Sequence, residues 1–198
     1  MSFEKDRLEP RRITDPRAMR AVAHPTRLDL MELLGREGEL TATRAGELLG
    51  LSAANCSFHL RQLAKYGFVE EADGGRGRNR PWRIASVSHR WEDSDSDPGT
   101  SAAASALSMM VLEREMERLA GWFERQRDES PAWRDASSSM TAILYLTESE
   151  LAALSSQLDA LCAPYLDRSA DASLRPPGSR PVALLGAAYP LVPTPSGG

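Results

Sequence analysis

Two groups of polar and basic side chains in the first half of the chain have the chemistry to bind nucleic acid. The first lies between residues 52 and 65, where Asn, Ser, Arg and Gln recur on one side of an expected helix. The second is the run at 74–80, which contains three glycines and three arginines. Amide and hydroxyl groups read base edges through hydrogen bonds, and arginine suits phosphates. The two groups therefore indicate contacts to bases and to a phosphate backbone.

A helix, a tight turn, a second helix and a hairpin are expected to position these groups. Thr41 is a capping residue for the first helix, which Gly50 ends, and Ser52 caps the second. The second helix points an apolar face inward, made of Cys56, Leu60 and Leu63. Strands at 68–71 and 81–84 then flank the arginine-rich tip. This order places one helix in a major groove and a cationic hairpin beside it.

The outward side chains of this segment are the predicted DNA contacts. On the helices they are Thr43, Ser52, Ala53, Ala54, Asn55, Ser57, Phe58, His59, Arg61, Gln62 and Lys65, and on the hairpin Arg76, Arg78 and Arg80. Small residues at the start of the second helix let its backbone approach the groove floor. A protein–protein interaction module of the same shape is the alternative, but it would tolerate acidic or apolar residues on this face. DNA binding is therefore the favoured prediction.

Three stretches of the chain resemble the ArsR-type winged helix-turn-helix repressors. They are the run from Ala23 to Leu34, the run from Leu51 to Leu63, and the segment Tyr66-Gly67-Phe68-Val69. The resemblance covers roughly residues 15–84 and implies a bacterial transcriptional regulator that binds operator DNA as a homodimer. Repression is the leading prediction for its mode of regulation. Phe58 departs from the family, which usually has a polar residue there. Contact with a thymine methyl group and stacking on a sugar both remain open for it.

Charge and composition agree with a DNA-binding first half and place the protein in the cytoplasm. Residues 1–90 hold 16 Lys and Arg against 12 Asp and Glu, while residues 91–198 hold 8 against 16. Attraction to DNA is thus local to the first half. The sequence contains no apolar run of membrane-spanning length and no signal-like N-terminus. Cys56 and Cys162 read as buried apolar residues, which fits a reducing compartment.

The predicted fold class is mainly α with small β, α+β, with a winged helix-turn-helix domain followed by a helical or α+β dimerisation domain. The expected organisation is a flexible N-terminus at 1–13, the DNA-binding domain at 14–85, an acidic linker at 86–103, the C-terminal dimerisation and possible effector domain at 104–192, and a tail at 193–198. Strands are expected at 140–146 and 180–185, with a capping box at Thr147-Glu148-Ser149-Glu150 that begins a helix.

A seam on the helix at 104–128 is the predicted dimer surface. Its apolar residues repeat at steps of three and four: Met109, Leu112, Met116, Leu119 and Phe123. Such a seam also packs within single domains, and the family precedent of a C-terminal dimerisation helix favours a partner copy. A small apolar ligand, bound by the Met and aromatic side chains of this helix, is a further possibility, although such a stripe is more often core.

Metal sensing and catalysis lack the residues that they need, so no cofactor is expected. The segment 40–47 has no Cys pair, and no histidine follows His89. His24, before Pro25, reads as a cap or packing residue. None of the three histidines has a nucleophile or carboxylate partner by motif, and the glycine-rich tip lacks the ending of a phosphate loop. DNA-dependent regulation without metal sensing is the remaining prediction.

Overall fold

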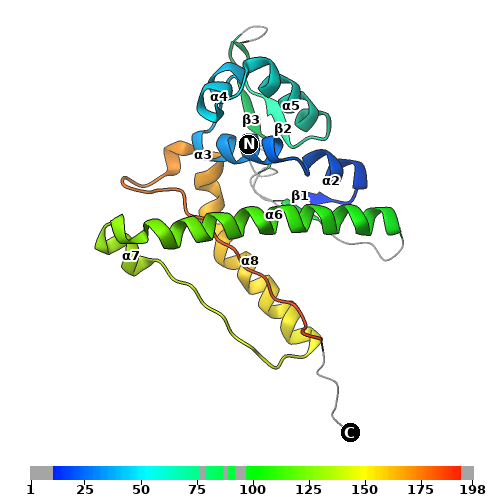
Figure 1. Cartoon of the computed structure of the whole chain (residues 1–198), viewed down its shortest axis with the longest axis vertical. Coiled ribbons are helices and arrows are strands. Elements are labelled where there is room, and N and C mark those ends of the chain that lie inside the picture. Colours follow the sequence, from blue (N-terminus) through cyan, green and yellow to red (C-terminus); the bar gives the residue numbers. More distant parts are fainter. Residues whose placement is uncertain (1–10, 76–78, 87–88, 92–96, 193–198) are drawn as a thin grey trace. The chain divides into compact units, whose positions relative to one another are not determined.

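A computed structural model describes residues 11–75, 79–86, 89–91 and 97–192, and it divides into two units. The first comprises residues 1–114 and 165–181, and the second comprises residues 115–164 and 182–198. The first unit begins with strand β1 and four helices (Figure 1): β1 at Arg11–Ile13, α2 at Pro16–Val22, α3 at Pro25–Glu37, α4 at Ala42–Leu49 and α5 at Ala53–Lys65. The bounds of α4 and α5 confirm the two helices that were expected after Thr41 and after Ser52.

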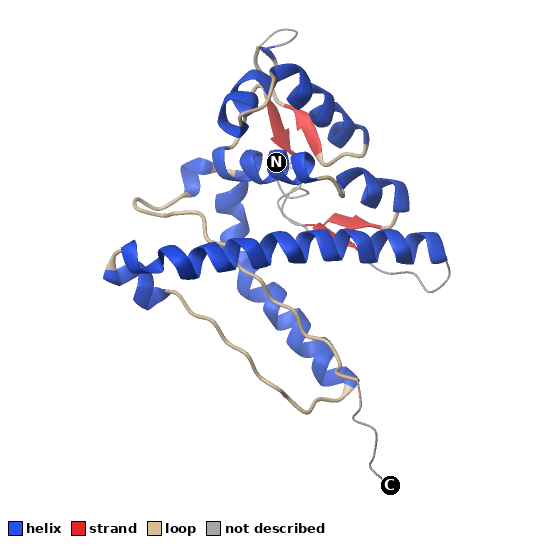
Figure 2. Cartoon of the chain, in the orientation of Figure 1, coloured by secondary structure: helices blue, strands red, loops and turns tan. Residues whose placement is uncertain are grey.

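The described strands of the same unit form two small two-stranded sheets (Figure 2). Strands β2 (Val69–Glu71) and β3 (Trp82–Ile84) are antiparallel, with Val69 opposite Ile84. Leu40 extends this hairpin because its backbone N–H and C=O both bond to Trp82, at 3.0 and 2.8 Å. Strand β4 (His89–Trp91) pairs in parallel with β1, so that Ile13 lies opposite Trp91.

One hydrophobic core joins these elements. Its large fully buried side chains come from α2, α3, α5, the start of the hairpin and a later helix: Met19, Leu30, Leu34, Cys56, Leu60, Leu63, Phe68, Val69 and Leu107. Helices held on one core beside an antiparallel hairpin form an α+β winged helix fold, as predicted. Helix α5 is thereby fixed along its inward face, because removing any of these side chains would leave a cavity.

The N-terminal expectation requires a correction at residues 11–13. These residues were assigned to a flexible terminus, yet β1 pairs with β4 and Ile13 is 3% exposed. The Arg11 guanidinium donates to the backbone carbonyls of Tyr66 and Gly67 and lies 5.0 Å from the ring centre of Phe68. Backbone pairing and burial together order this segment. Both depend on residues far along the chain, so the charged local sequence does not predict them.

The expected linker at 86–103 also differs from the structure. Helix α6 (Pro98–Arg125) begins inside it, and Asp97 caps the helix by accepting hydrogen bonds from the N–H groups of Gly99 and Thr100, both at 3.1 Å. Proline suits the first turn of a helix, so Pro98 starts this one instead of ending a segment. The first turns of α6 then bury Ala103, Ala104 and Leu107 in the core of the first unit.

In the second unit the described residues are helical or extended without strand pairing. A short 3₁₀ turn at Gln126–Asp128 and helix α7 (Pro131–Ala136) follow α6, and helix α8 (Glu148–Ala170) belongs to this unit as far as Pro164. The capping box is confirmed, since Thr147 Oγ1 accepts from the Glu150 N–H at 3.3 Å and Glu150 accepts from the Thr147 N–H at 2.7 Å.

The strands expected at 140–146 and 180–185 do not form. Both segments lie exposed, with Tyr145 98% exposed. A strand needs a neighbour to satisfy its backbone groups, and β propensity alone supplies none. Among the described residues, no helix has the length and apolar character needed to cross a membrane.

Candidate nucleic-acid interface

The turn between α4 and α5 is fixed by caps and by one close backbone contact. Thr41 and Ser52 cap the two helices, each accepting from a backbone N–H three residues on at 3.2 Å. Gly50 adopts the left-handed conformation, with φ 68°. Gly46 is buried against the turn, where an added Cβ would lie 2.6 Å from the Leu51 carbonyl oxygen. The angle between the two helices therefore depends on glycine at 46.

Helix α5 divides into a buried face and an exposed face, as its sequence predicts. Cys56, Leu60 and Leu63 are fully buried, and burial raises the pKa of the Cys56 thiol. The opposite face presents its predicted contact residues to solvent: Ser52, Ala53, Ala54, Asn55, Phe58, Arg61 and Lys65 are exposed, and Ser57 and Gln62 are partly exposed. Thr43 on α4 is exposed as well. One rigid helix thus carries amide, hydroxyl and cationic groups on a single open face.

His59 does not join this exposed face. It is 7% exposed, with its ring 4.6 Å from that of His24 and its Nδ1 accepting from Arg27 Nε at 3.4 Å. Burial, followed by the charges of His24 and Arg27, lowers the pKa of His59. Its position two residues before Arg61 turns it towards the start of α3. The structure therefore assigns His59 a packing role between helices in place of the predicted DNA contact.

The start of α3 confirms one of the two roles predicted for His24, that of a helix cap. His24 Nδ1 accepts a hydrogen bond from the Thr26 N–H at 3.2 Å, so His24 caps the helix. Arg27 also donates to the Ala21 carbonyl. Arg27 thus bonds both to Ala21 at the end of α2 and to His59 in the middle of α5. These bonds fix the position of α5 against α2 and α3.

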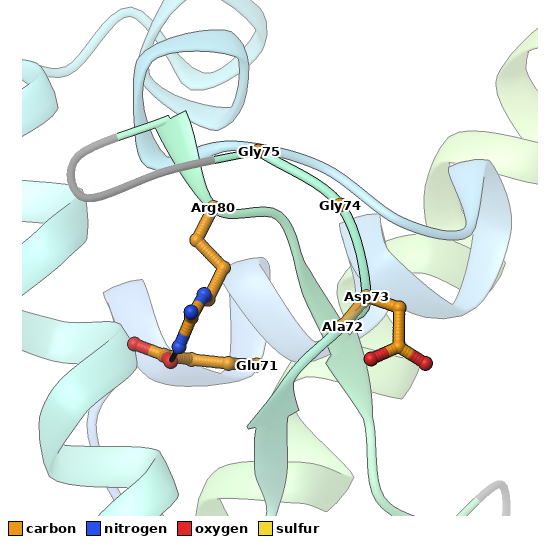
Figure 3. A pocket seen from close by; sticks show the side chains of 6 residues that line it. All are labelled: Glu71, Ala72, Asp73, Gly74, Gly75 and Arg80. Atoms are coloured by element: carbon orange, nitrogen blue, oxygen red, sulfur yellow. Dashed lines mark hydrogen bonds and ion pairs between the residues drawn. The ribbon is translucent and has the colours of Figure 1, made fainter.

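The hairpin carries one described arginine at its tip, and that arginine is paired. Arg80 turns back along the hairpin to Glu71, with Nη1 and Oε2 2.5 Å apart (Figure 3). Arg76 and Arg78 lie outside the described residues. Arg83, on β3, pairs with Glu70 at 2.7 Å. An exposed ion pair contributes little to stability, so a phosphate can compete with Glu71 for Arg80.

The predicted dimer residues lie along α6 with large exposed fractions. Met109 is 55% exposed, Leu112 42%, Met116 52% and Phe123 49%, whereas Leu119 is partly buried. In the single chain the four exposed side chains lie at the surface, and Met109 also lines an open hollow with Trp91 and Ala104. These residues therefore form an apolar stripe that is largely exposed on α6.

Sequence reasoning missed the ion cluster that holds α6 to α3. Arg114 donates to Asp29 at 2.6 Å and also pairs with Glu32. Arg114 lies more than 80 positions from both acidic residues, so no local sequence pattern predicts the cluster. Gly46 was missed as well, although a glycine inside an apolar-periodic helix is a recognised sign of close packing. Among the described residues no group of three or more potential metal ligands comes together.

Comparison with known proteins supports the helix-turn-helix assignment. Residues 22–72 match a family described as a helix-turn-helix domain. The matched segment contains α3, α4, the turn, α5 and β2, which is less than half of the chain, and it indicates a DNA-binding transcriptional regulator. One similar solved structure is a MarR family regulator from Neisseria meningitidis, 18% identical over 70% of this chain and 73% of that chain, with a TM-score of 0.31. No curated protein matched the chain.

Proposed function

We propose that this protein is a transcriptional regulator of the ArsR type that binds duplex operator DNA through the exposed face of α5. The observation that carries the proposal is the division of α5 into a fully buried apolar face and an open face with amide, hydroxyl and cationic groups. A helix anchored in this way presents its side chains to a major groove at a fixed angle, which base reading requires.

The test begins with a pool of random duplexes from which the full chain selects its preferred DNA. Arg61→Ala should then weaken binding to the selected sequence by about 1–3 kcal/mol, because a cation on the open face of α5 is lost. Arg125→Ala is the matched control, since it removes the same charge from the end of α6, outside the winged helix. Selection of no sequence by a folded chain would refute the proposal and favour the protein-binding alternative.

We also propose that the α6 stripe is the surface of a homodimer. A single recognition helix buries too little surface for tight specific binding, so such domains read two half-sites as a two-fold dimer. The exposed side chains at Met109, Leu112, Met116 and Phe123 would lose their contact with water on dimerisation, which stabilises the dimer by roughly 25 cal/mol for each Å² of apolar surface covered.

Sedimentation of the intact chain tests the dimer. Combined Leu112→Asp and Leu119→Asp substitutions should yield monomers with much weaker operator binding, while the helix content stays unchanged. Glu113→Gln with Glu117→Gln is the control, because both residues are exposed on the same helix and off the stripe. A wild-type chain that is monomeric at micromolar concentration and still protects two half-sites would contradict this architecture.

Repression without metal sensing is the mode of regulation that we propose. Occupying an operator requires only tight and specific binding, which the dimer supplies. The segment 40–47 contains no cysteine or histidine, and no histidine follows His89, so soft or imidazole ligands are scarce. A reporter placed behind the selected operator should be silenced by the protein. Zinc, cadmium or arsenite should not release the protein from that operator in vitro, and metal-dependent release would contradict the second part of the proposal.

A further inference from the structure

Phe58 is an exposed aromatic side chain in the middle of the face that the proposed function uses. It is 53% exposed, on the second turn of α5. Ala54, Phe58, Arg61 and Lys65 are spaced by four, three and four residues, so they form one stripe along the helix. All four are exposed. The stripe thus places an apolar ring between a small residue and a cation.

The ring of Phe58 is held in place from beneath. It meets the ring of His59 edge to face, with centroids 5.2 Å apart and an interplanar angle of 75°. His59 is buried and bonded to Arg27, and it also packs on His24. An aromatic pair of this geometry is favourable beyond the area that it covers. Phe58 is therefore a supported ring with one side open to solvent.

We infer that Phe58 reads the C5 methyl group of a thymine in the major groove. This inference rests on the proposed function. A phenyl ring has no hydrogen-bond donor or acceptor for base edges or phosphates, and the thymine methyl is the one apolar group that the edges of the base pairs present in that groove. Ala54, one turn earlier, lets the helix approach the base pairs. The ring then covers the methyl group and both lose their contact with water.

The spacing along α5 also places the thymine relative to a second base. Phe58 and Arg61 are three residues apart, which is about 4.5 Å along a helix axis. One base-pair step in duplex DNA is about 3.4 Å. The thymine covered by Phe58 should therefore lie one or two base pairs from the base that Arg61 contacts. Arginine pairs best with guanine, so the half-site should hold a thymine and a guanine in close succession.

Replacement of thymine by deoxyuridine isolates the methyl group, because nothing else in the base pair changes. In the operator selected by the full-length protein, each thymine of one half-site is replaced in turn. Removing the methyl group under Phe58 should weaken wild-type binding by about fourfold, the contribution of one buried group of that size. The same replacement should change the affinity of Phe58→Ala by less than about 1.5-fold, because the ring that senses the methyl group is gone.

Two further variants separate methyl reading from a general loss of contact. Phe58→Leu keeps an apolar group over the methyl, so it should retain a preference for thymine over deoxyuridine. Lys65→Ala, on the same stripe, should weaken binding to both probes equally and keep the full methyl preference of the wild type. Circular dichroism and thermal melting should show that each variant folds, since both substituted side chains are exposed.

The possible outcomes are distinct. A methyl preference that persists unchanged in Phe58→Ala, or the absence of any methyl-sensitive thymine with wild-type protein, overturns the inference. Equal weakening on both probes in Phe58→Ala would instead show that the ring stacks on a sugar, which also overturns it. Failure of the wild-type chain to select any duplex overturns the proposed function, and the inference falls with it. Loss of the preference in Phe58→Ala alone, with Lys65→Ala unaffected, supports it.

Discussion

His89 should make the stability of the first unit depend on pH between about 4 and 6.5. It begins β4, with its ring 5.5 Å from that of Phe68. Its Nε2 atom is inaccessible to solvent and has no hydrogen-bond partner among the described residues. Burial, with a smaller contribution from the charge of Arg11, lowers the pKa of His89 from 6.5 to about 4. The folded protein therefore holds this imidazole in its neutral form.

The size and direction of the effect follow from that pKa. As pH falls below 6.5, the unfolded chain binds a proton at His89 before the folded chain does, so the free energy of unfolding decreases. The decrease continues until the folded form also protonates, at about pH 4. A shift of this size corresponds to a total of about 3 kcal/mol, at 1.36 kcal/mol per pKa unit. Full stability is thus present above pH 6.5.

The assay compares wild type with His89→Gln, which removes the titration. Urea unfolding followed by tryptophan fluorescence at pH 7.5, 6, 5 and 4 gives the free energy of unfolding of each protein. The difference between the two should change by about 3 kcal/mol in favour of the variant as the pH falls, because all other titrations cancel. Parallel pH profiles, or an NMR titration of His89 with a pKa near 6.5, would refute the reasoning.

Substitutions at three other positions test the scaffold of the interface. Gly46→Ala should lower the free energy of unfolding by about 1–2 kcal/mol, because crowding of the turn outweighs a gain of up to about 1 kcal/mol in helix propensity. A melting curve should show the loss of stability, and an operator-binding assay should show the loss of DNA affinity. Arg114→Leu should lower the free energy of unfolding by about 1–2 kcal/mol, because Asp29 and Glu32 lose their partner. An unchanged chemical denaturation curve would mean that the cluster does not stabilise the fold. Ser52→Ala should cost about 1 kcal/mol through loss of the cap on α5, whereas Ser52→Asn, which also caps, should keep wild-type stability in the same measurement.

The helices of the DNA-binding segment could be predicted because their signals are local. Thr41, Ser52 and Thr147 mark helix starts through bonds to residues only three positions away, and the structure confirms each one. The inward face of α5 followed from spacing alone. The residues of the open face were predicted as well, except at His59. The position of His59 on the helix is compatible with either an exposed or a buried side chain, and its packing on His24 and Arg27 decides between them.

The features that could not be predicted depend on residues far apart in the chain. The parallel pairing of β1 with β4 joins residues 11–13 to residues 89–91, and neither strand is apolar enough to stand out. Asp97 and Pro98 resembled a break in an acidic segment, although the same pair suits a helix start. Conversely, residues 140–146 have the composition of a strand, but the described chain offers them no neighbour.

The unbroken course of α6 affects how this regulator can be recombined with others. Its first turns belong to the core of the first unit, through Ala103 and Leu107, and the same helix continues to Arg125. No loop separates the part of α6 that packs in the core from the part that carries Met116 and Phe123. A hybrid protein must therefore be joined within the helix. Each residue added or removed at such a junction rotates everything beyond it by about 100°. Only junctions that preserve the helical phase would keep the stripe of Met116 and Phe123 in line with Met109 and Leu112.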